Sequence, residues 1–324
     1  MTPQVSVVVP TYKRPDLLSR CLTHLLLQDL NAGQYEIIVV DDARDPSTEA
    51  LIRSVTGRAR RPAPPVRCIP VQGAHGPARA RNQGWRAAAA PVIAFTDDDT
   101  LPDRHWLSGG LKALADGADA AWGRIMVPCP NSPTDYERDA AGLATAGFVT
   151  ANCFARRQAL DAVGGFDEQF QLAWREDSDL YFSLLEHRKR VVYTREALVI
   201  HPIRAAQWGV SLRQQRKSLF DALLYKKHPE LCRRHSIPSV RLYYGIVLAL
   251  LAAALLSLEH FNKEAAVMFA LWAVLTAEFL WRRLAGTSRS PGHLVEMLVT
   301  SILIPPIAVF WRFAGAVRFR VLFI

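Results

Sequence analysis

The sequence lacks the patterns that mark several large classes of protein. Its five cysteines are an odd number and none are spaced as Cys-x-x-Cys, which favours reduced thiols in the cytosol over a disulfide framework. No Gly-x-Gly-x-x-Gly follows the first apolar run, and this disfavours a dinucleotide-dependent dehydrogenase. That run, residues 5–9, ends at Pro10 and is too short for the core of a signal peptide.

Length and charge limit the choice of partners. The 324 residues, half of them apolar, allow one large domain with an appendage. The formal net charge of +9 favours an anionic partner such as nucleotide phosphates, an anionic membrane face or nucleic acid. Zinc-finger spacing, aromatic RNA-binding motifs and recognition-helix signatures are all missing, so we expect no nucleic-acid partner.

Strand-like and helix-like patterns alternate over the first hundred residues. Short runs rich in β-branched residues predict strands at 5–9, 36–40, 66–70 and 92–96, and helical spacing predicts helices at 15–27, 48–55 and 77–89. This alternation predicts an α/β fold with a mostly parallel sheet between helices. Ligands bind at the carboxyl ends of such strands, where Asp41-Asp42 and Asp97-Asp98-Asp99 fall.

The Asp97-Asp98-Asp99 cluster has a chemistry of its own. Adjacent carboxylates repel one another, and a hard divalent cation with oxygen ligands relieves that repulsion. Mg²⁺ or Mn²⁺ would also hold the phosphates of a nucleotide. An acidic loop or helix cap without a metal is the simpler alternative.

Beyond residue 238 the composition changes to three long apolar runs. They cover residues 242–258, 265–281 and 294–313. The first two are near the lower length limit for crossing a bilayer. Pro305-Pro306 in the third leaves open a kinked span or a segment that enters and leaves by one face. A buried helical core is the alternative, but Trp and Tyr near the ends of the runs favour a membrane.

Basic residues are unevenly distributed around these runs. Eight precede the first run: Arg213, Arg216, Lys217, Lys226, Lys227, Arg233, Arg234 and Arg241. Residues 259–264 contain a single Lys, whereas residues 282–293 contain three Arg. Because basic segments stay in the cytoplasm, we expect a cytoplasmic-membrane protein with its catalytic part inside. The basic stretch either lies on anionic headgroups or is a solvated helix face.

Several motifs occur in a fixed order along residues 4–203. Around the Asp97–Asp99 cluster they are Val5-Ser-Val-Val-Val-Pro-Thr-Tyr-Lys-Arg14, Glu36-Ile-Ile-Val-Val-Asp-Asp42, Gly76-Pro-Ala-Arg-Ala-Arg-Asn-Gln-Gly84, Gly164-Gly-Phe-Asp-Glu168 and Trp174-Arg-Glu-Asp-Ser-Asp-Leu180. Together they resemble the family-2 glycosyltransferases. The resemblance implies a GT-A fold, a nucleoside-diphosphate sugar donor, a divalent metal (Mn²⁺ or Mg²⁺) and inversion at the anomeric carbon.

The resemblance also implies roles for individual residues. Asp177 would be the general base that takes the proton of the attacking acceptor hydroxyl, with Glu176 or Asp179 as alternatives. Asp97 and Asp99 match the family's Asp-x-Asp acids and would bind the metal together with His201. The donor would be bound by Pro10, Thr11, Tyr12, Arg14, Asp41, Asp42, Arg79, Asn82 and Asp97.

These observations predict three regions and one reaction. We expect a GT-A domain at 1–210, a basic amphipathic or interfacial linker at 211–241, and a membrane region at 242–324 with two or three apolar helices. The reaction would transfer a sugar to a hydroxyl or phosphate group of an acceptor that is lipid-linked or part of a glycan. Membrane lipids are expected as further partners of the protein. The Gln-x-x-Arg-Trp motif of processive members is missing, which favours single transfers.

Two other functions remain as alternatives at this point. One is a catalytically inert membrane scaffold that binds nucleotide sugars, against which the intact Asp97, Asp99 and Asp177 argue. The other is a nucleotidyltransferase, which would need a Gly-rich phosphate loop where this chain has Pro10-Thr-Tyr-Lys-Arg14.

Overall fold

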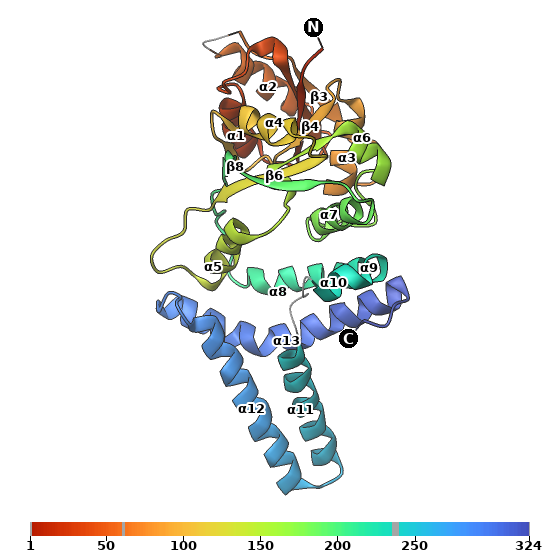
Figure 1. The fold of residues 1–324 in the computed structure, drawn as a ribbon. Helices are drawn as coiled ribbons and strands as arrows, with labels where there is room; N and C mark the ends of the chain where they lie inside the picture. Colours follow the sequence, from red (N-terminus) through yellow and green to blue (C-terminus); the bar gives the residue numbers. More distant parts are fainter. Residues whose placement is uncertain (1, 60–61, 235–239, 324) are drawn as a thin grey trace. The chain divides into compact units, whose positions relative to one another are not determined.

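The computed structural model describes residues 2–59, 62–234 and 240–323, so residues 235–239 of the predicted linker lie outside the described residues. The chain divides into two compact units. The first combines Met1–Pro128 with Gly142–Ile203, and the second combines Cys129–Ala141 with Arg204–Ile324. The first unit is α/β and the second is helical (Figure 1).

An eight-stranded sheet forms the centre of the first unit, in the order β3-β2-β1-β4-β7-β6-β8-β5. The strands are β1 (Val5–Thr11), β2 (Tyr35–Asp41), β3 (Val66–Pro70), β4 (Val92–Phe95), β5 (Leu101–Pro102), β6 (Ala120–Met126), β7 (Cys153–Arg156) and β8 (Val191–Ile200). Strands β3, β2, β1 and β4 run parallel, as predicted. The other half is mixed, because β7 is antiparallel to β4 and β6, and β5 is antiparallel to β8. The predicted α/β fold is confirmed.

Helices cover both faces of the sheet, which explains why β1 and β2 are apolar at successive positions. Val5, Val7 and Val9 pack with one set of helices, and Val8 and Ile38 pack with the other. The first set is α1 (Pro15–Leu25), α2 (Ser47–Gly57) and α4 (Trp106–Ala115), and the second is α3 (Pro77–Ala87), α6 (Arg157–Val163) and α7 (Glu176–Glu186). Short 3-10 turns lie at Ala32–Gln34, Gly142–Thr145 and Thr150–Asn152.

Helix α3 lies unusually close to the sheet. A Cβ atom added to Gly84 would lie 2.4 Å from Cγ1 of Val8 and 2.9 Å from Cγ2 of Val40, so a larger residue there would push the helix away. The buried face of α3 includes Ala78, Arg81 and Trp85, which share one side at helical spacing. This packing carries the Arg81 side chain into the interior of the unit.

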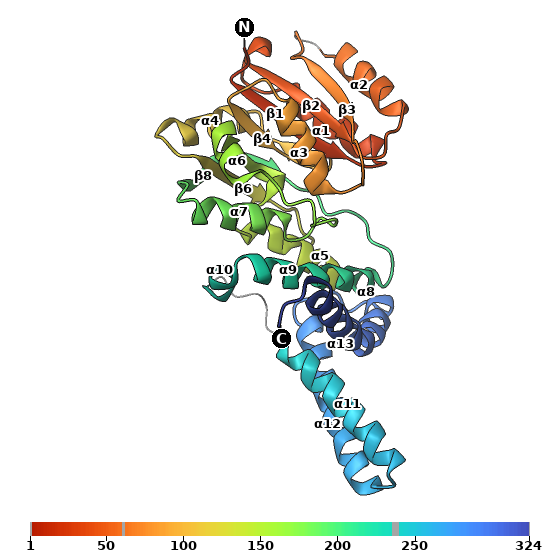
Figure 2. The same ribbon diagram turned by 90° about the vertical axis from the view of Figure 1, so that its right-hand side faces the viewer.

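The second unit consists of helices. They are α5 (Asp135–Ala141), α8 (Val210–Gln214), the 3-10 helix η4 (Gln215–Ser218), α9 (Leu219–Lys227), α10 (Pro229–Arg234), α11 (Arg241–Leu258), α12 (Asn262–Leu284) and α13 (Pro291–Phe319). Helices α11 and α12 lie side by side as a hairpin, and α13 runs across its base (Figures 1 and 2). The three predicted apolar runs lie within α11, α12 and α13, which are each long and apolar enough to cross a membrane.

Helix α13 is continuous through Pro305-Pro306 and has two different faces. One face packs against η4 and α9, where the Arg312 guanidinium lies 3.7 Å from the Asp221 carboxylate and the Phe319 ring contacts Phe220. The other face exposes large apolar side chains: Leu294, Val295, Leu298, Ile302, Leu303, Phe310, Phe313 and Val317. The helix therefore has an exposed apolar face and a packed face that includes polar side chains.

Candidate active site

The parallel half of the sheet gathers the predicted polar residues at one edge. In register, Thr11 at the end of β1 pairs with Asp41 at the end of β2, and β1 also pairs in parallel with β4. The Asp97–Asp99 cluster begins two residues after β4 ends at Phe95. Since parallel strands end on the same side, all three segments converge there.

Three of these residues form a candidate metal centre. One ligand atom from each of Asp97, Asp99 and His201 lies within 4.8 Å of the others, and His201 Nε2 is 3.5 Å from Asp99 Oδ1. His201 reaches the acids because the short strand β5, just after them, pairs Leu101 with Ile200. The His201 backbone N–H also donates to the Met126 carbonyl at 2.8 Å. The predicted ligands are thus brought together by sheet pairing.

Asp98, the middle acid, points to different partners. Its carboxylate accepts hydrogen bonds from the Thr11 hydroxyl at 2.8 Å and the Arg14 guanidinium at 3.1 Å. The residue is 2% exposed, and burial raises the pKa of its carboxyl group. Asp98 therefore ties the end of β1 to the acidic cluster. Thr11 and Arg14, predicted to bind the donor, lie at this edge and are engaged with Asp98.

Arg81 is a central group of the site, although it is not among the residues assigned above to the donor, the metal or the base. Its buried guanidinium donates to Asp97 Oδ1 at 2.7 Å and to Glu176 Oε1 at 3.0 Å, joining the strand-end acids to α7. Burial by itself would raise the pKa of Asp97, but the charge and hydrogen bond of Arg81, together with the nearby His201 and Arg14, outweigh burial and lower it. The signal in the sequence was the helical spacing of Arg81 with Ala78 and Trp85, which places it on the sheet-facing side.

The predicted base lies at the start of α7. Asp177 is half-buried, and its Oδ1 accepts the Ser178 backbone N–H at 2.6 Å. Burial raises the pKa of Asp177, and burial also raises the pKa of Glu176 to about 7. Glu176 is committed to Arg81 through one oxygen, and its other oxygen is buried with no partner in the described part of the chain. Of these two neighbours, Asp177 is the more accessible carboxylate.

The acids after β2 organise the loops around them. Asp41 accepts the backbone N–H groups of Ala43 at 2.9 Å and Asp45 at 2.7 Å. Asp42 accepts the Gly76 backbone N–H at 3.0 Å and lies 3.2 Å from Nδ1 of His75, whose ring has an edge contact with Tyr12. Tyr12 is 45% exposed, so its ring presents a flat surface next to Asp42. Pro10 lies within β1, in register with Val40 of β2.

Arg79 and Asn82 hold the segment that follows α6. Arg79 pairs with Glu168 at 2.7 Å, and the buried Asn82 amide donates to the Phe166 carbonyl at 2.8 Å and to Glu168 at 3.0 Å. The Asn82 side-chain oxygen accepts from the Phe166 backbone N–H and from the Trp85 indole, both at 3.0 Å. These contacts fix the Gly164–Glu168 motif against α3. The predicted donor-binding roles of Arg79 and Asn82 stay predictions.

The fold places this chain in a known structural class. A mannosyltransferase structure from Pyrobaculum calidifontis, solved in complex with GDP-Man and Mn²⁺, matches 99% of this chain and 88% of its own with a TM-score of 0.55 and 19% identity. The mixed sheet with helices on both faces is that of a GT-A glycosyltransferase. The family model for glycosyl transferase family 2 matches residues 6–176, and that for glycosyl transferase family group 2 matches residues 92–314. The chain belongs to glycosyl transferase family 2.

Individual curated relatives match part of this chain. Glycosyltransferase AglE of Haloferax volcanii is 24% identical over 66% of this chain and 71% of its own length. The GalNAc(5)-diNAcBac-PP-undecaprenol beta-1,3-glucosyltransferase of Campylobacter jejuni is 28% identical over 39% of this chain and 38% of its own length. Of other curated relatives, the chain spans between 15% and 56% of their own length.

Proposed function

We propose that this glycosyltransferase uses a nucleoside-diphosphate sugar and a divalent metal, and that it inverts the anomeric carbon. The observation that carries the proposal is the convergence of Asp97, Asp99 and His201 within 4.8 Å at the carboxyl edge of the sheet. The bound GDP-Man and Mn²⁺ of the Pyrobaculum mannosyltransferase support both the donor class and the metal.

The residues at this edge suit Mn²⁺ or Mg²⁺. Two carboxylates and one imidazole supply the oxygen and nitrogen donors that such ions accept, with positions left for phosphate oxygens. When bound, the ion would offset the negative charge that develops on the departing diphosphate. Arg81, in contact with Asp97, adds a fixed positive charge on the same side.

The proton of the acceptor is assigned to Asp177. An acceptor hydroxyl must lose its proton as it attacks the anomeric carbon, and a carboxylate within hydrogen-bond reach can accept it. The raised pKa of Asp177 makes it a better base than an ordinary surface carboxylate. Glu176 is paired with Arg81, and Asp179 is 1% exposed, so neither alternative is as free to meet an acceptor.

The donor nucleotide is proposed to lie over the ends of β1 and β2. Tyr12 offers an exposed ring for the base, and Asp42, together with its neighbour Asp41, lies where the ribose would be held. Thr11 and Arg14, which both donate hydrogen bonds to Asp98, lie at the same edge. Arg79, Asn82 and Pro10 complete the proposed donor set.

The second unit is proposed to attach the protein to the cytoplasmic membrane. At 1.5 Å per residue, α11 and α12 are about 27 and 35 Å long, close to the ~30 Å apolar thickness of a bilayer. The three Arg between residues 282 and 293 support a cytoplasmic position for the end of this hairpin and for the catalytic unit. The undecaprenol-linked substrate in the name of the Campylobacter relative supports a lipid-linked acceptor.

The test separates metal binding from base catalysis. Asp99→Ala should weaken Mn²⁺-dependent binding of GDP and UDP by at least ~100-fold, more than the loss of a group that only supports a metal ligand. Asp177→Asn should bind them normally but transfer sugar about 10²- to 10⁴-fold more slowly. Asp116→Ala, which removes an exposed carboxylate directly after α4, is the matched control. Wild-type metal dependence in Asp99→Ala would refute the metal centre, and near-normal transfer by Asp177→Asn would exclude it as the base.

A further inference from the structure

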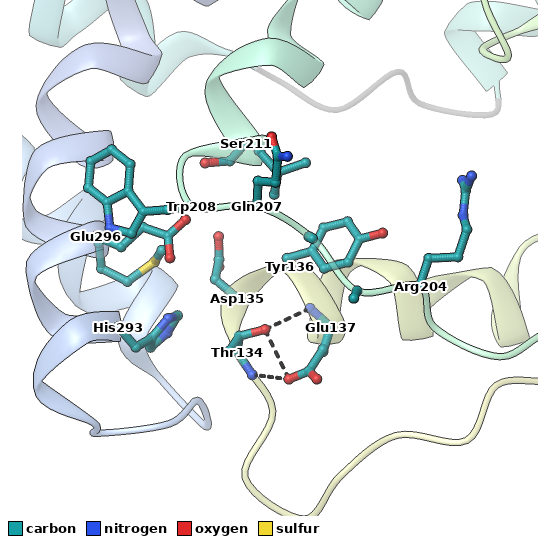
Figure 3. A pocket seen from close by; sticks show the side chains of 14 residues that line it. Thr134, Asp135, Tyr136, Glu137, Arg204, Gln207, Trp208, Ser211, His293 and Glu296 are labelled. Carbon is teal, nitrogen blue, oxygen red and sulfur yellow. Dashed lines mark hydrogen bonds between the residues drawn. The ribbon is translucent and has the colours of Figure 1, made fainter.

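The second unit contains a cavity of about 280 Å³ that none of the predicted site residues line. Its walls come from three segments that are distant in sequence, at residues 134–137, 204–211 and 293–297 (Figure 3). The volume is near the lower end of the ~300–1,000 Å³ typical of small-molecule sites.

The walls of this cavity are fixed by buried polar contacts. The Arg283 guanidinium, 6% exposed, donates to Asp135 on one wall at 2.7 Å and to Thr300 of α13 at 2.7 Å. Glu296 of α13 accepts the backbone N–H of Gly209 at 2.7 Å, which joins the second and third segments. The cavity is therefore held open by specific interactions, as expected of a preorganised site.

His293 is the feature of the cavity that folding alone does not explain. Its side chain lines the cavity and is 5% exposed, yet neither ring nitrogen has a hydrogen-bond partner in the described part of the chain (Figure 3). Buried polar groups are almost always paired, because leaving them unpaired costs their lost hydration. A ligand hydroxyl group that reaches the imidazole would supply a partner that the described residues do not.

The remaining lining defines the class of ligand. Asp135, Glu137 and Glu296 bring three carboxylates to the cavity, and Arg204 is the one arginine or lysine among its lining residues, which disfavours an anion. Among the described residues, the cluster with the spacing of metal ligands is Asp97, Asp99 and His201, and none of these lines the cavity. A metal ion in the cavity is therefore disfavoured too.

Two aromatic side chains, Tyr136 and Trp208, lie among these polar groups, and Trp208 is 57% exposed. A sugar ring matches such a lining, since its hydroxyl groups bond to carboxylates and imidazole while its C–H face packs on an aromatic ring.

We propose that this cavity is a saccharide subsite that binds a sugar ring of the acceptor. The inference rests on the proposed transferase function and names its acceptor as one that carries at least one sugar. The cavity begins three residues after the candidate metal ligand His201 in sequence. The sugar is recognised by His293 and the carboxylates around it, with Trp208 as a stacking surface.

The experiment measures binding of simple sugars without donor or metal. Methyl glycosides of glucose, galactose, mannose and N-acetylglucosamine are titrated into the full-length protein in detergent and followed by saturation-transfer NMR. At least one should bind, and Trp208→Ala and His293→Leu should each weaken it about tenfold, the loss expected for one or two good contacts. Trp281→Ala, which removes another exposed tryptophan, from α12, should leave binding unchanged.

A second readout guards against misfolded variants. Because His293→Leu removes two unpaired polar atoms, its melting temperature should equal or exceed that of the wild type while glycoside binding falls. The proposal is overturned if no glycoside binds, if both variants bind as well as the wild type, or if inorganic phosphate binds the cavity instead. Mn²⁺-dependent GDP or UDP binding is measured in parallel, so that failure of the proposed donor chemistry is seen separately.

Discussion

At the scale of single residues, Arg81 is the group that organises the site. It is buried, and it contacts an acid from the strand-end cluster and an acid from α7. Buried ion pairs add little net stability, but removing one partner leaves a buried charge uncompensated. Arg81 therefore holds Asp97 and Glu176 in place, and the stability of the fold depends on its charge.

Replacing Arg81 should expose this dependence. Arg81→Met should lower the free energy of unfolding by about 3–5 kcal/mol, because two acids lose their counter-charge. Adding Glu176→Gln should restore part of the loss, since the neutral amide removes one of the unpaired charges. Urea unfolding of both variants measures this, with Arg86→Met as the control for an exposed arginine on the same helix. If Arg81→Met and Arg86→Met lower the free energy of unfolding equally, Arg81 is not the counter-charge on which Asp97 and Glu176 depend.

At the scale of elements, a buried carboxylate fastens the parallel strands together. Glu36 of β2 accepts the Ser6 hydroxyl of β1 at 2.6 Å, the Arg67 guanidinium of β3 at 3.0 Å and the Ala89 backbone N–H at 2.6 Å. Burial by itself would raise the pKa of Glu36, but these three hydrogen bonds outweigh burial and lower it. One residue thus connects three strands and the end of α3.

This arrangement predicts an acid-sensitive sheet. Because the folded-state pKa of Glu36 is lowered, its contribution is fully present above the unfolded value of about 4.3 and is lost as the pH falls through the folded value. At pH 7, Glu36→Gln should cost about 1–3 kcal/mol, and the difference from wild type should shrink below pH 4. Melting temperatures from pH 3 to 7 test this. The control is Glu49→Gln, which changes an exposed acid on α2, and its difference in melting temperature from the wild type should not shrink at low pH. If the difference between Glu36→Gln and the wild type stays the same from pH 3 to 7, the proposed role of the Glu36 carboxylate is wrong.

At the scale of the whole molecule, the second unit contains three helices that are long and apolar enough to cross a membrane. Helix α13 buries polar groups along its length, from His293 through Thr300 to Arg312, and exposes apolar side chains on its opposite face. A membrane-spanning helix rarely carries so many buried polar groups on one side against short helices such as α9. We expect α11 and α12 to span the bilayer and α13 to lie in the interface plane.

The number of helices that cross the membrane decides on which side residue 324 lies. If α11 and α12 cross it, that residue lies on the same side as the catalytic unit; if α13 crosses as well, it lies on the opposite side. If α13 lies in the plane, alkaline phosphatase fused after the last residue should be inactive in a bacterial host, and green fluorescent protein fused there should fluoresce. Phosphatase fused after His260, in the turn between α11 and α12, should be active, and a fusion after Ser288 should be inactive. Phosphatase activity at the C-terminal fusion would show that α13 crosses the membrane.

Much of the first unit could be predicted because its signals are local. The β-branched runs at 5–9 and 36–40, and Pro10 after the first of them, predicted β1 and β2 with ends displaced by one or two residues. Because these strands are apolar at successive positions, both faces of the sheet had to be covered by helices. Because the strands run parallel, the acids after β2 and β4 had to lie at the same edge of the sheet. The amino-acid sequence alone therefore determined the parallel half-sheet, its acidic edge and the three apolar helices.

Tertiary structure decided what depends on contacts between distant segments. The antiparallel entry of β7, and the pairing of β5 with β8 that brings His201 to Asp99, leave no periodic trace in the sequence. The same is true of Arg81, whose spacing marks a buried face but not the acids it meets. His293 and the walls around it come together only because residues 134–137, 204–211 and 293–297 fold against one another. The physical reason is that local patterns report which face of an element is buried, whereas the partner on that face is chosen by the packing of the whole chain.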